Sequence, residues 1–246
     1  MLLAVDIGNT NIKFGFYDGP LLTAKSSFST HSESFEKRVT GVLVDKSFTR
    51  VIICSAVPSV EARLAEMIKR EYSIHAVVVR NDFDFGLKIS YEPLSAIGTD
   101  RLVNCFSAVA KYGAPCIVCS FGTAATFDLV DENRELVGGA IAPGLAAMAK
   151  ALSLVTARLP EVAVDATPAL IATTTEGSIH SGVFFGHMGA AEGIVERFQA
   201  EFGQTVRVVA TGGHAQLVAE NTKKTLDTVD ENLLLDGLRI LSERYL

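Results

Sequence analysis

The sequence predicts an α/β protein made of two similar lobes. Short apolar strands alternate with helical segments along the chain, which indicates helices layered on sheets. A strand, a glycine turn and a second strand open the chain, and the same order recurs 114 residues later, where Gly122 follows Gly8. We therefore expect lobes at 1–113 and 114–246, each with a mixed sheet and flanking helices, around a central cleft that both turns face.

The elements of the first lobe follow from hydrophobic spacing and turn signals. Four short apolar runs bounded by Gly, Pro or polar residues predict strands. Apolar residues three and four apart, with charged residues between them, predict a helix that ends near Tyr72. Thr99 or Asp100 can cap a second helix through a side-chain oxygen. The expected elements are strands at 2–6, 12–17, 51–55 and 76–79, and helices at 60–72 and 98–113.

The second lobe is expected to hold strands at 116–120, 126–130 and 206–211, a turn-rich loop at 138–144, an alanine-rich helix after it, and helices at 175–202 and 230–245. Four glycines share one face of the helix at 175–202, at positions 182, 186, 189 and 193. Each glycine costs a helix about 1 kcal/mol relative to alanine. Either another backbone packs closely on this face, from the same chain or a second copy, or the helix is weak.

Composition narrows the classes of function. The net charge of −6 and the pI of about 5.4 argue against broad contact with nucleic-acid phosphates. No apolar run reaches the roughly 18 residues of a membrane span. No basic region precedes the first apolar run, so we expect no secretory signal. These features predict a cytoplasmic protein without a nucleic-acid or membrane partner.

The four cysteines are Cys54, Cys105, Cys116 and Cys119. The last two form a C-x-x-C, which is compatible with metal or redox chemistry. However, they lie in an expected buried strand, where residues three apart point to opposite faces, and no second pair completes a zinc site. We interpret all four as small apolar fillers in a reducing compartment.

The turn at 6–13 is the first candidate site. Asp6 ends a strand, and Gly8 lets the backbone approach a ligand closely. Backbone N–H groups beside Asn9 and Thr10 can hold phosphate oxygens, and Lys13 adds a positive charge. Asp6 can hold Mg²⁺, which prefers one or two carboxylates together with phosphate oxygens. The alternative is an ordinary hairpin with polar turn residues.

Three further motifs are weaker when taken singly. Residues 120–124 can form a partner phosphate turn that uses the Gly122 backbone and the Thr123 hydroxyl. At the start of the expected helix, Asp100 can act as a general base and Arg101 can bind a carboxylate, although a cap with a surface ion pair is the alternative. Residues 211–213 can lie against adenine or ribose, or form a plain turn.

These motifs together resemble type III pantothenate kinases, of the actin, hexokinase and heat-shock-chaperone ATPase superfamily. The strongest matches are D-I-G-N-T-N-I-K at 6–13, G-T-D-R at 98–101 and F-G-T-A-A-T-F-D at 121–128. The others are S-A-V-P at 55–58, Y-E-P at 91–93, G-G-A-I-A-P-G at 138–144, T-E-G-S-I-H-S-G at 175–182, T-G-G at 211–213 and N-L-L-L-D-G-L at 232–238.

The resemblance implies duplicated ribonuclease-H-like lobes and ATP-dependent phosphorylation of pantothenate to 4'-phosphopantothenate, the first step toward coenzyme A. It also implies a homodimer with the pantothenate pocket at the subunit interface, Mg²⁺ held by Asp6, and Asp100 as the base. The ATP-binding residues would be Asp6, Ile7, Gly8, Asn9, Thr10, Asn11, Ile12, Lys13 and Thr123. The pantothenate-binding residues would be Tyr91, Gly98, Thr99, Asp100, Arg101 and Thr175.

Ser120 departs from the family pattern. Family members carry an aspartate there, which binds a monovalent cation such as K⁺ or NH₄⁺, and a serine hydroxyl is a weaker ligand without the negative charge. K⁺ or NH₄⁺ as a cofactor is therefore left open. Two other functions also remain open: an impaired paralogue with a regulatory or accessory binding role, and a kinase for another small hydroxy acid.

Overall fold

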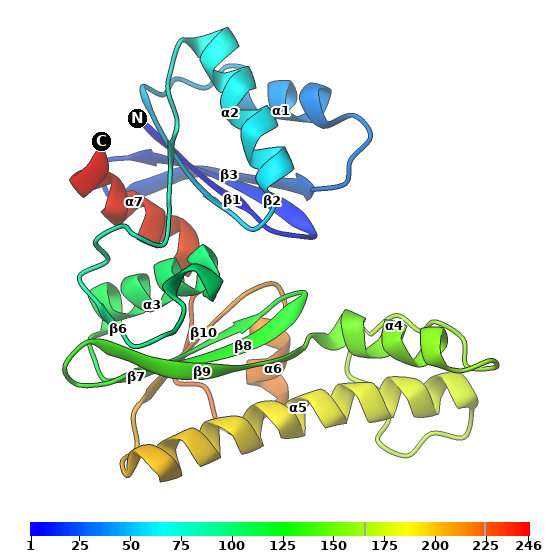
Figure 1. The fold of residues 1–246 in the computed structure, drawn as a ribbon. Helices are drawn as coiled ribbons and strands as arrows, with labels where there is room; N and C mark the ends of the chain where they lie inside the picture. The colour runs from blue at the N-terminus through cyan, green and yellow to red at the C-terminus, as the bar shows by residue number, and fades with distance from the viewer. Residues whose placement is uncertain (165, 224) are drawn as a thin grey trace. The chain divides into compact units, whose positions relative to one another are not determined.

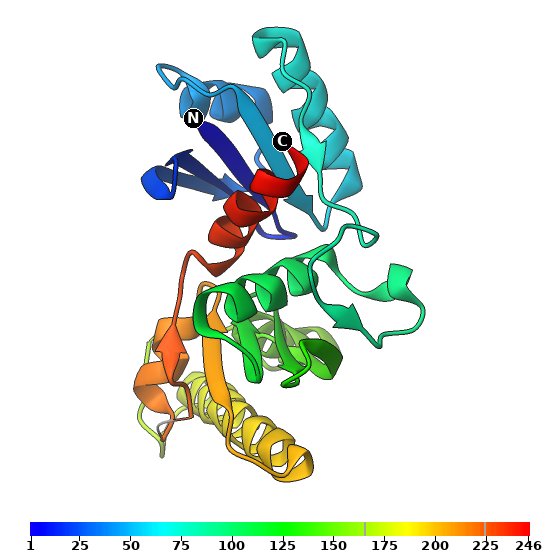
Figure 2. The ribbon, with the colours of Figure 1, turned by 90° about the vertical axis from the view of Figure 1, so that its left-hand side faces the viewer.

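The computed structural model describes residues 1–164, 166–223 and 225–246. The chain forms two compact units, each with its own sheet (Figures 1 and 2). The first unit comprises 1–87, 91–111 and 232–246, and the second comprises 88–90 and 112–231. In the described part of the chain, no helix is both long enough and apolar enough to cross a bilayer.

The first sheet has the order β3-β2-β1-β4-β5. Its strands are β1 (Leu2–Ile7), β2 (Asn11–Asp18), β3 (Leu21–Ser29), β4 (Arg50–Ser55) and β5 (Val77–Val78). β1 pairs antiparallel with β2 and parallel with β4. Helices α1 (Phe35–Leu43) and α2 (Pro58–Tyr72) cover one face and enclose a core with the aromatic rings of Phe14 and Phe28 (Figure 1).

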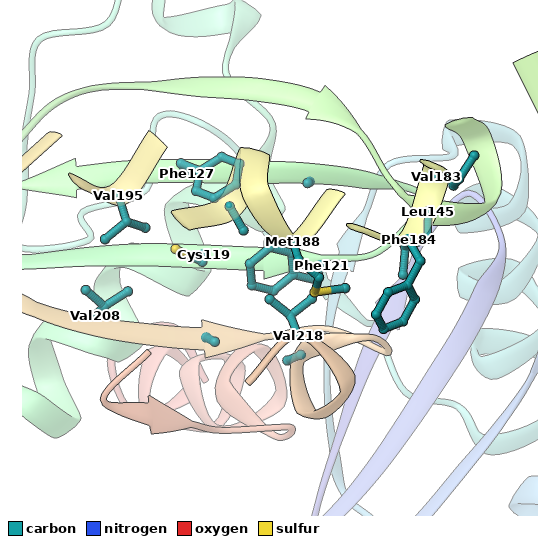
Figure 3. Packing of buried hydrophobic residues seen from close by; sticks show 14 of the residues in the cluster. Cys119, Phe121, Phe127, Leu145, Val183, Phe184, Met188, Val195, Val208 and Val218 are labelled. Carbon is teal, nitrogen blue, oxygen red and sulfur yellow. The ribbon is translucent and has the colours of Figure 1, made fainter. Parts of the chain in front are cut away.

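The second sheet has the order β11-β10-β7-β8-β9-β6. Its strands are β6 (Lys88–Ile89), β7 (Cys116–Phe121), β8 (Ala124–Val130), β9 (Glu135–Pro143), β10 (Arg207–Thr211) and β11 (Thr228–Val229). Helices α5 (Thr175–Phe202) and α6 (Ala215–Asn221) lie on one face, and α4 (Leu145–Val155) packs on α5 beyond the end of β9 (Figure 1). Figure 3 shows this core, in which Phe121 and Phe127 from the sheet meet Met188 from α5.

The two sheets repeat one topology, as the sequence predicted. The order β3-β2-β1-β4-β5 corresponds to β9-β8-β7-β10-β11, with an antiparallel partner on one side of the first strand and a parallel partner on the other. The two turns differ by one residue, because the last pair before the turn is Ile7 with Ile12 in one sheet and Phe121 with Ala125 in the other.

The compact units differ from the division expected at 113/114 in three segments: 88–90 and 112–113 belong to the second unit, and 232–246 belongs to the first. Helix α7 (Leu233–Tyr245) belongs to the first unit, because it packs against β1 and β4 on the face opposite α1 and α2. Residues 88–90 belong to the second unit, because β6 pairs with the edge strand β9. Both assignments depend on long-range pairing rather than on position in the sequence.

The prediction of a loop at 138–144 is wrong, since most of this segment belongs to strand β9. β9 pairs antiparallel with β8 from Pro143 back to Leu136, with a register shift at Leu129 and Val130. Glycine lowers the intrinsic strand preference, but pairing with a neighbouring strand supplies the backbone hydrogen bonds that a loop would lack. The cross-strand partner therefore overrides the local turn signal.

The helix expected at 175–202 is confirmed as α5, with the same bounds. On its glycine face, a Cβ atom added at Gly182, Gly186 or Gly189 would meet no atom of the described residues within 4 Å beyond the helix's own neighbouring backbone. At Gly193 it would meet the side chain of Arg197. The expected close approach of a backbone from the same chain is therefore not found among the described residues.

Candidate active site

Asp6 lies near the carboxyl end of β1, aligned with Lys13 on β2 and Cys54 on β4. The residue is 9% exposed, and its Oδ2 lies 3.8 Å from the Lys13 Nζ. Burial raises the pKa of Asp6 from 3.8 to about 6; Lys13 opposes this increase and the negative charge of Asp100 adds to it. The Asp6 carboxylate is therefore destabilised in its ionised form, and a bound cation would stabilise that form.

The turn after Asp6 is tight and tied to a neighbouring segment. The Gly8 N–H donates to the Asn11 carbonyl at 3.0 Å, and a Cβ on Gly8 would lie 3.2 Å from that oxygen. Thr30 fixes the turn from outside, because its hydroxyl donates to the Gly8 carbonyl at 2.7 Å and its N–H to the Thr10 carbonyl at 2.9 Å. Asn9, Thr10 and Asn11 are exposed. The result is a rigid, accessible turn beside a buried carboxylate.

Helix α3 (Thr99–Tyr112) carries Asp100 in its first turn. The Cys54 Sγ lies 3.4 Å from the Thr99 Oγ1, at hydrogen-bonding distance for sulfur. Because Cys54 is the direct neighbour of Asp6 in the sheet, this contact connects the start of α3 with Asp6. A Cβ at Gly98 would overlap the Asp100 carboxylate, so that carboxylate folds back over Gly98.

Arg101 is 5% exposed, and its guanidinium lies 5.2 Å from the centroid of the Tyr91 ring. Arg101 is therefore not at the surface, as a surface ion pair would require. Stacking on an aromatic face is a favoured arrangement for a guanidinium. It places Tyr91 next to the first turn of α3, within the same unit.

Three glycine turns meet in the second unit, a feature that the sequence analysis missed. The Gly122 N–H donates to the Ala124 carbonyl at 2.9 Å, and the Gly144 N–H to the Thr123 carbonyl at 3.1 Å. A Cβ at Gly144 would overlap the carbonyls of Gly122 and Thr123, and one at Gly212 would overlap the Phe121 backbone. The motifs around 122, 144 and 212 thus form one packed assembly of backbone. The signal available in the sequence was that each follows or precedes a strand.

Ser120 occupies the position on β7 that Asp6 occupies on β1. It is aligned with Thr126 on β8 and Thr211 on β10. Residues aligned across adjacent strands point to the same face of a sheet, so three hydroxyl groups lie in one row beside the Gly122 turn. Where the first sheet has a carboxylate and an ammonium group in this row, the second has neutral side chains.

Thr175 begins α5 and is exposed. It lines a groove of about 580 Å³ whose other walls are largely apolar and come from Pro143, Met148, Leu152, Ile179 and Val183 among others. Thr175, Thr123 and Ser120 belong to the second unit. The first unit brings together the expected residues 6–13, Tyr91 and 98–101.

All four cysteines are buried thiols, in agreement with their interpretation as apolar fillers. Burial raises the pKa of Cys116 to about 12 and the pKa of Cys119 further, so neither is a thiolate at neutral pH. Among the histidines, His187 is 3% exposed beside the Phe121 ring, and burial together with the charge of His214 lowers its pKa.

Comparisons with known proteins identify one family. Residues 2–197 match the family model described as type III pantothenate kinase. A type III pantothenate kinase from Brevibacillus brevis is 39% identical over 254 residues, covering 99% of both chains. Another from Dehalococcoides mccartyi strain BAV1 is 37% identical over 249 residues, covering 98% of this chain and 94% of the relative.

Solved structures support the fold. A protein from Campylobacter jejuni described as a Baf family transcriptional activator superposes with a TM-score of 0.58 at 20% identity, covering 99% and 98% of the two chains. A ROK family glucokinase from Streptomyces griseus superposes with a TM-score of 0.54 at 12% identity, also covering 99% and 98%. These identities establish the actin-like ATPase and sugar-kinase fold alone. The family model and the full-length relatives establish more: the chain belongs to the type III pantothenate kinase family.

Proposed function

We propose that this protein transfers the γ-phosphoryl group of ATP to the primary hydroxyl of pantothenate and forms 4'-phosphopantothenate for coenzyme A biosynthesis. Membership of the family supports the substrate class. The structural observation that carries the proposal is that the start of α3, with Asp100, lies close to Asp6. The Thr99 hydroxyl contacts Cys54, the strand neighbour of Asp6, and the charge of Asp100 adds to the raised pKa of Asp6. Phosphoryl transfer needs one group to hold charge at the phosphate and another to receive the hydroxyl proton.

Asp6 would hold Mg²⁺, directly or through water. The residues fit such an ion, because Asp6 is a buried carboxylate with a raised pKa, next to a turn that exposes Asn9 and Thr10. Mg²⁺ favours one or two carboxylates together with phosphate oxygens. When bound, the ion would neutralise charge on the phosphoryl oxygens. The second lobe carries Ser120 at the equivalent position, so we propose only weak stimulation by K⁺ or NH₄⁺.

The backbone of residues 7–12 would hold the β- and γ-phosphates, with Lys13 as a compensating charge. The tight hydrogen bonds of Gly8 and Thr30 support this role, because a turn that is already rigid loses little entropy on binding. Thr123, on an exposed turn packed against Gly144, would also contact ATP.

Asp100 would accept the proton of the pantothenate hydroxyl and orient that oxygen for in-line attack. Its position at the start of α3, over Gly98, supports this role. Tyr91, Gly98, Thr99 and Arg101 would contact pantothenate beside it. The buried guanidinium of Arg101 would attract the carboxylate of pantothenate more strongly than an exposed one.

A homodimer with the pantothenate pocket at its interface would complete the site through Thr175. Two features support this assembly. Apolar side chains near the Thr175 groove are exposed, with Leu154 at 73%, Val155 at 78% and Ile171 at 87%. The glycine face of α5 is also open in the described residues of a single chain.

A coupled assay with ATP, Mg²⁺ and pantothenate, with and without K⁺, tests the proposed function. We expect ADP release that depends on pantothenate, and loss of at least about 100-fold in kcat for Asp100→Asn. A panel of other hydroxy acids should give at least about tenfold lower kcat/KM. ADP release that is fastest with another hydroxy acid would identify a different kinase and contradict the proposal.

Ser120 favours a second candidate, an impaired family member with a regulatory or accessory role. This candidate predicts binding of ATP or pantothenate, measured by calorimetry, without turnover in the coupled assay. Turnover at rates of about 1–100 s⁻¹, typical of kinases, would exclude it.

A further inference from the structure

Asn81 connects two distant segments of the first unit. It follows β5, and its side-chain amide donates to the carbonyl of Ile97 at 2.6 Å and to the carbonyl of Leu94 at 3.0 Å. A primary amide has two N–H donors, so both carbonyls are satisfied by one side chain. These two bonds fix the segment that precedes the candidate base.

The bonded carbonyls lie directly before the start of α3. Leu94 begins a short 3₁₀ helix (Leu94–Ala96), and Ile97 immediately precedes Gly98. The Gly98 carbonyl then accepts from the N–H groups of Arg101 and Leu102, which sets the first turn of α3. The Asp100 carboxylate folds back over Gly98. A shift of the Ile97 carbonyl would therefore move the Asp100 carboxylate with it.

Asn81 is itself held firmly from the other side. The neighbouring Arg80 donates to both carboxylate oxygens of Glu61, at 2.6 and 3.1 Å, and Glu61 is 7% exposed on the first turn of α2. The Val79 N–H donates to the Ile53 carbonyl of β4 at 2.8 Å. Ile53 precedes Cys54, the strand neighbour of Asp6. The amide of Asn81 thus links the strand beside Asp6 to the turn that carries Asp100.

We propose that Asn81 is a positioning residue, which sets the place of the Asp100 carboxylate relative to Asp6 during phosphoryl transfer. This role rests on the proposed function. Displacing a reacting group by about 1 Å can cost 10²-fold in rate, so two short hydrogen bonds at the helix start are enough to matter. Among the described residues, the Asn81 side chain donates to the carbonyls of Leu94 and Ile97, and it acts on Asp100 through the backbone of 94–98.

The first test replaces Asn81 with aspartate, which has the same size but no amide donors. We expect Asn81→Asp to lower kcat at least about tenfold, with the KM for ATP changed less than about twofold. The matched control is Asp82→Asn, the reverse exchange at the next, exposed residue, which should keep kcat within about twofold. If Asn81→Asp does not fold, Asn81→Ala removes the same donors without adding a charge.

A double-mutant cycle separates positioning from a general loss of structure. In the Asp100→Asn background, Asn81→Asp should change the remaining rate by less than about threefold, because the group that it positions is gone. An equal loss of rate in both backgrounds would show a structural role and overturn the proposal.

Hydrogen exchange without substrate gives a readout independent of turnover. The amides of Arg101 and Leu102 should exchange at least about tenfold faster in Asn81→Asp than in the wild type or Asp82→Asn. Unchanged exchange and unchanged kcat in an active enzyme would overturn the role of Asn81 alone. A wild type that does not phosphorylate pantothenate would overturn the proposed function, and with it any role of Asn81 in that reaction.

Discussion

Asp6 and Ser120 occupy equivalent positions in the two sheets. Each is the fifth residue of a six-residue strand, and each is followed by one apolar residue and a glycine turn. Both have a parallel neighbour on one side and an antiparallel neighbour on the other. The duplicated fold thus presents a charged residue at this position in one sheet and a neutral residue in the other.

This difference leads to a prediction about monovalent cations. Ser120→Asp should increase the stimulation of the kinase by K⁺ at least about threefold over the wild type, because a carboxylate attracts a cation more strongly than a hydroxyl does. Initial rates in K⁺ and in choline at equal ionic strength measure the effect. A steep K⁺ requirement in the wild type that Ser120→Ala abolishes would contradict the prediction.

The raised pKa of Asp6 predicts that replacing this residue increases stability but abolishes activity. Because folding raises this pKa from 3.8 to about 6, the native state binds the proton more tightly than the unfolded chain does. Its contribution to stability is therefore present at low pH and declines as the pH rises through about 6. At pH 7, Asp6→Asn should raise the free energy of unfolding by up to about 3 kcal/mol, while Mg²⁺-dependent turnover is lost.

Urea unfolding at pH 7 and pH 4 measures this effect. The increase in the free energy of unfolding caused by Asp6→Asn should fall toward zero near pH 4, where the wild-type carboxyl group is mostly protonated in the native state. Lys13→Met serves as a control, since it removes the ammonium that opposes the raised pKa. If Asp6→Asn is less stable than the wild type at pH 7, burial of the Asp6 carboxylate does not dominate its contribution to stability, and the prediction is wrong.

The assembly of glycine turns predicts a specific loss of stability. Gly144→Ala and Gly212→Ala should each lower the free energy of unfolding by about 2 kcal/mol, because a Cβ would overlap neighbouring backbone. Gly212 also has a φ of +99°, which strains any other residue. Gly213→Ala is the control, since a Cβ there meets nothing within 4 Å among the described residues. Equal losses at 212 and 213 would contradict the packing.

Because the glycine face of α5 is open, Gly186→Ala should have opposite effects on stability in a monomer and in the proposed homodimer. In a monomer, Gly186→Ala should stabilise the protein by about 1 kcal/mol, since alanine is the better helix former. In the proposed homodimer, close packing at this face would instead make Gly186→Ala weaken the dimer at least about tenfold. Sedimentation at several concentrations together with thermal unfolding decides between them, and a variant that is more stable with an unchanged dimer would remove this face from the interface.

Local sequence patterns predicted much of the fold and part of the site. The helices expected at 98–113 and 230–245 from apolar spacing correspond to α3 (Thr99–Tyr112) and α7 (Leu233–Tyr245). The repeated strand-turn-strand follows from residues 2–17 and 116–130. The sequence analysis did not predict β3 or α1, because β3 is an alternating, half-exposed strand beside a stretch with few apolar residues. Its existence depends on pairing with β2, which a local pattern does not contain.

Short-range spacing was enough to predict the α/β class, the duplication, and the candidate residues Asp6, Asp100 and Ser120. Three features became visible only in the folded chain: α7 completes the first unit, residues 138–143 form a strand, and Asn81 holds the start of α3. The physical reason is common to all three. Each depends on hydrogen bonds or apolar contacts between segments far apart in the chain, and the free energy of such contacts is set by the partner as much as by the residue itself.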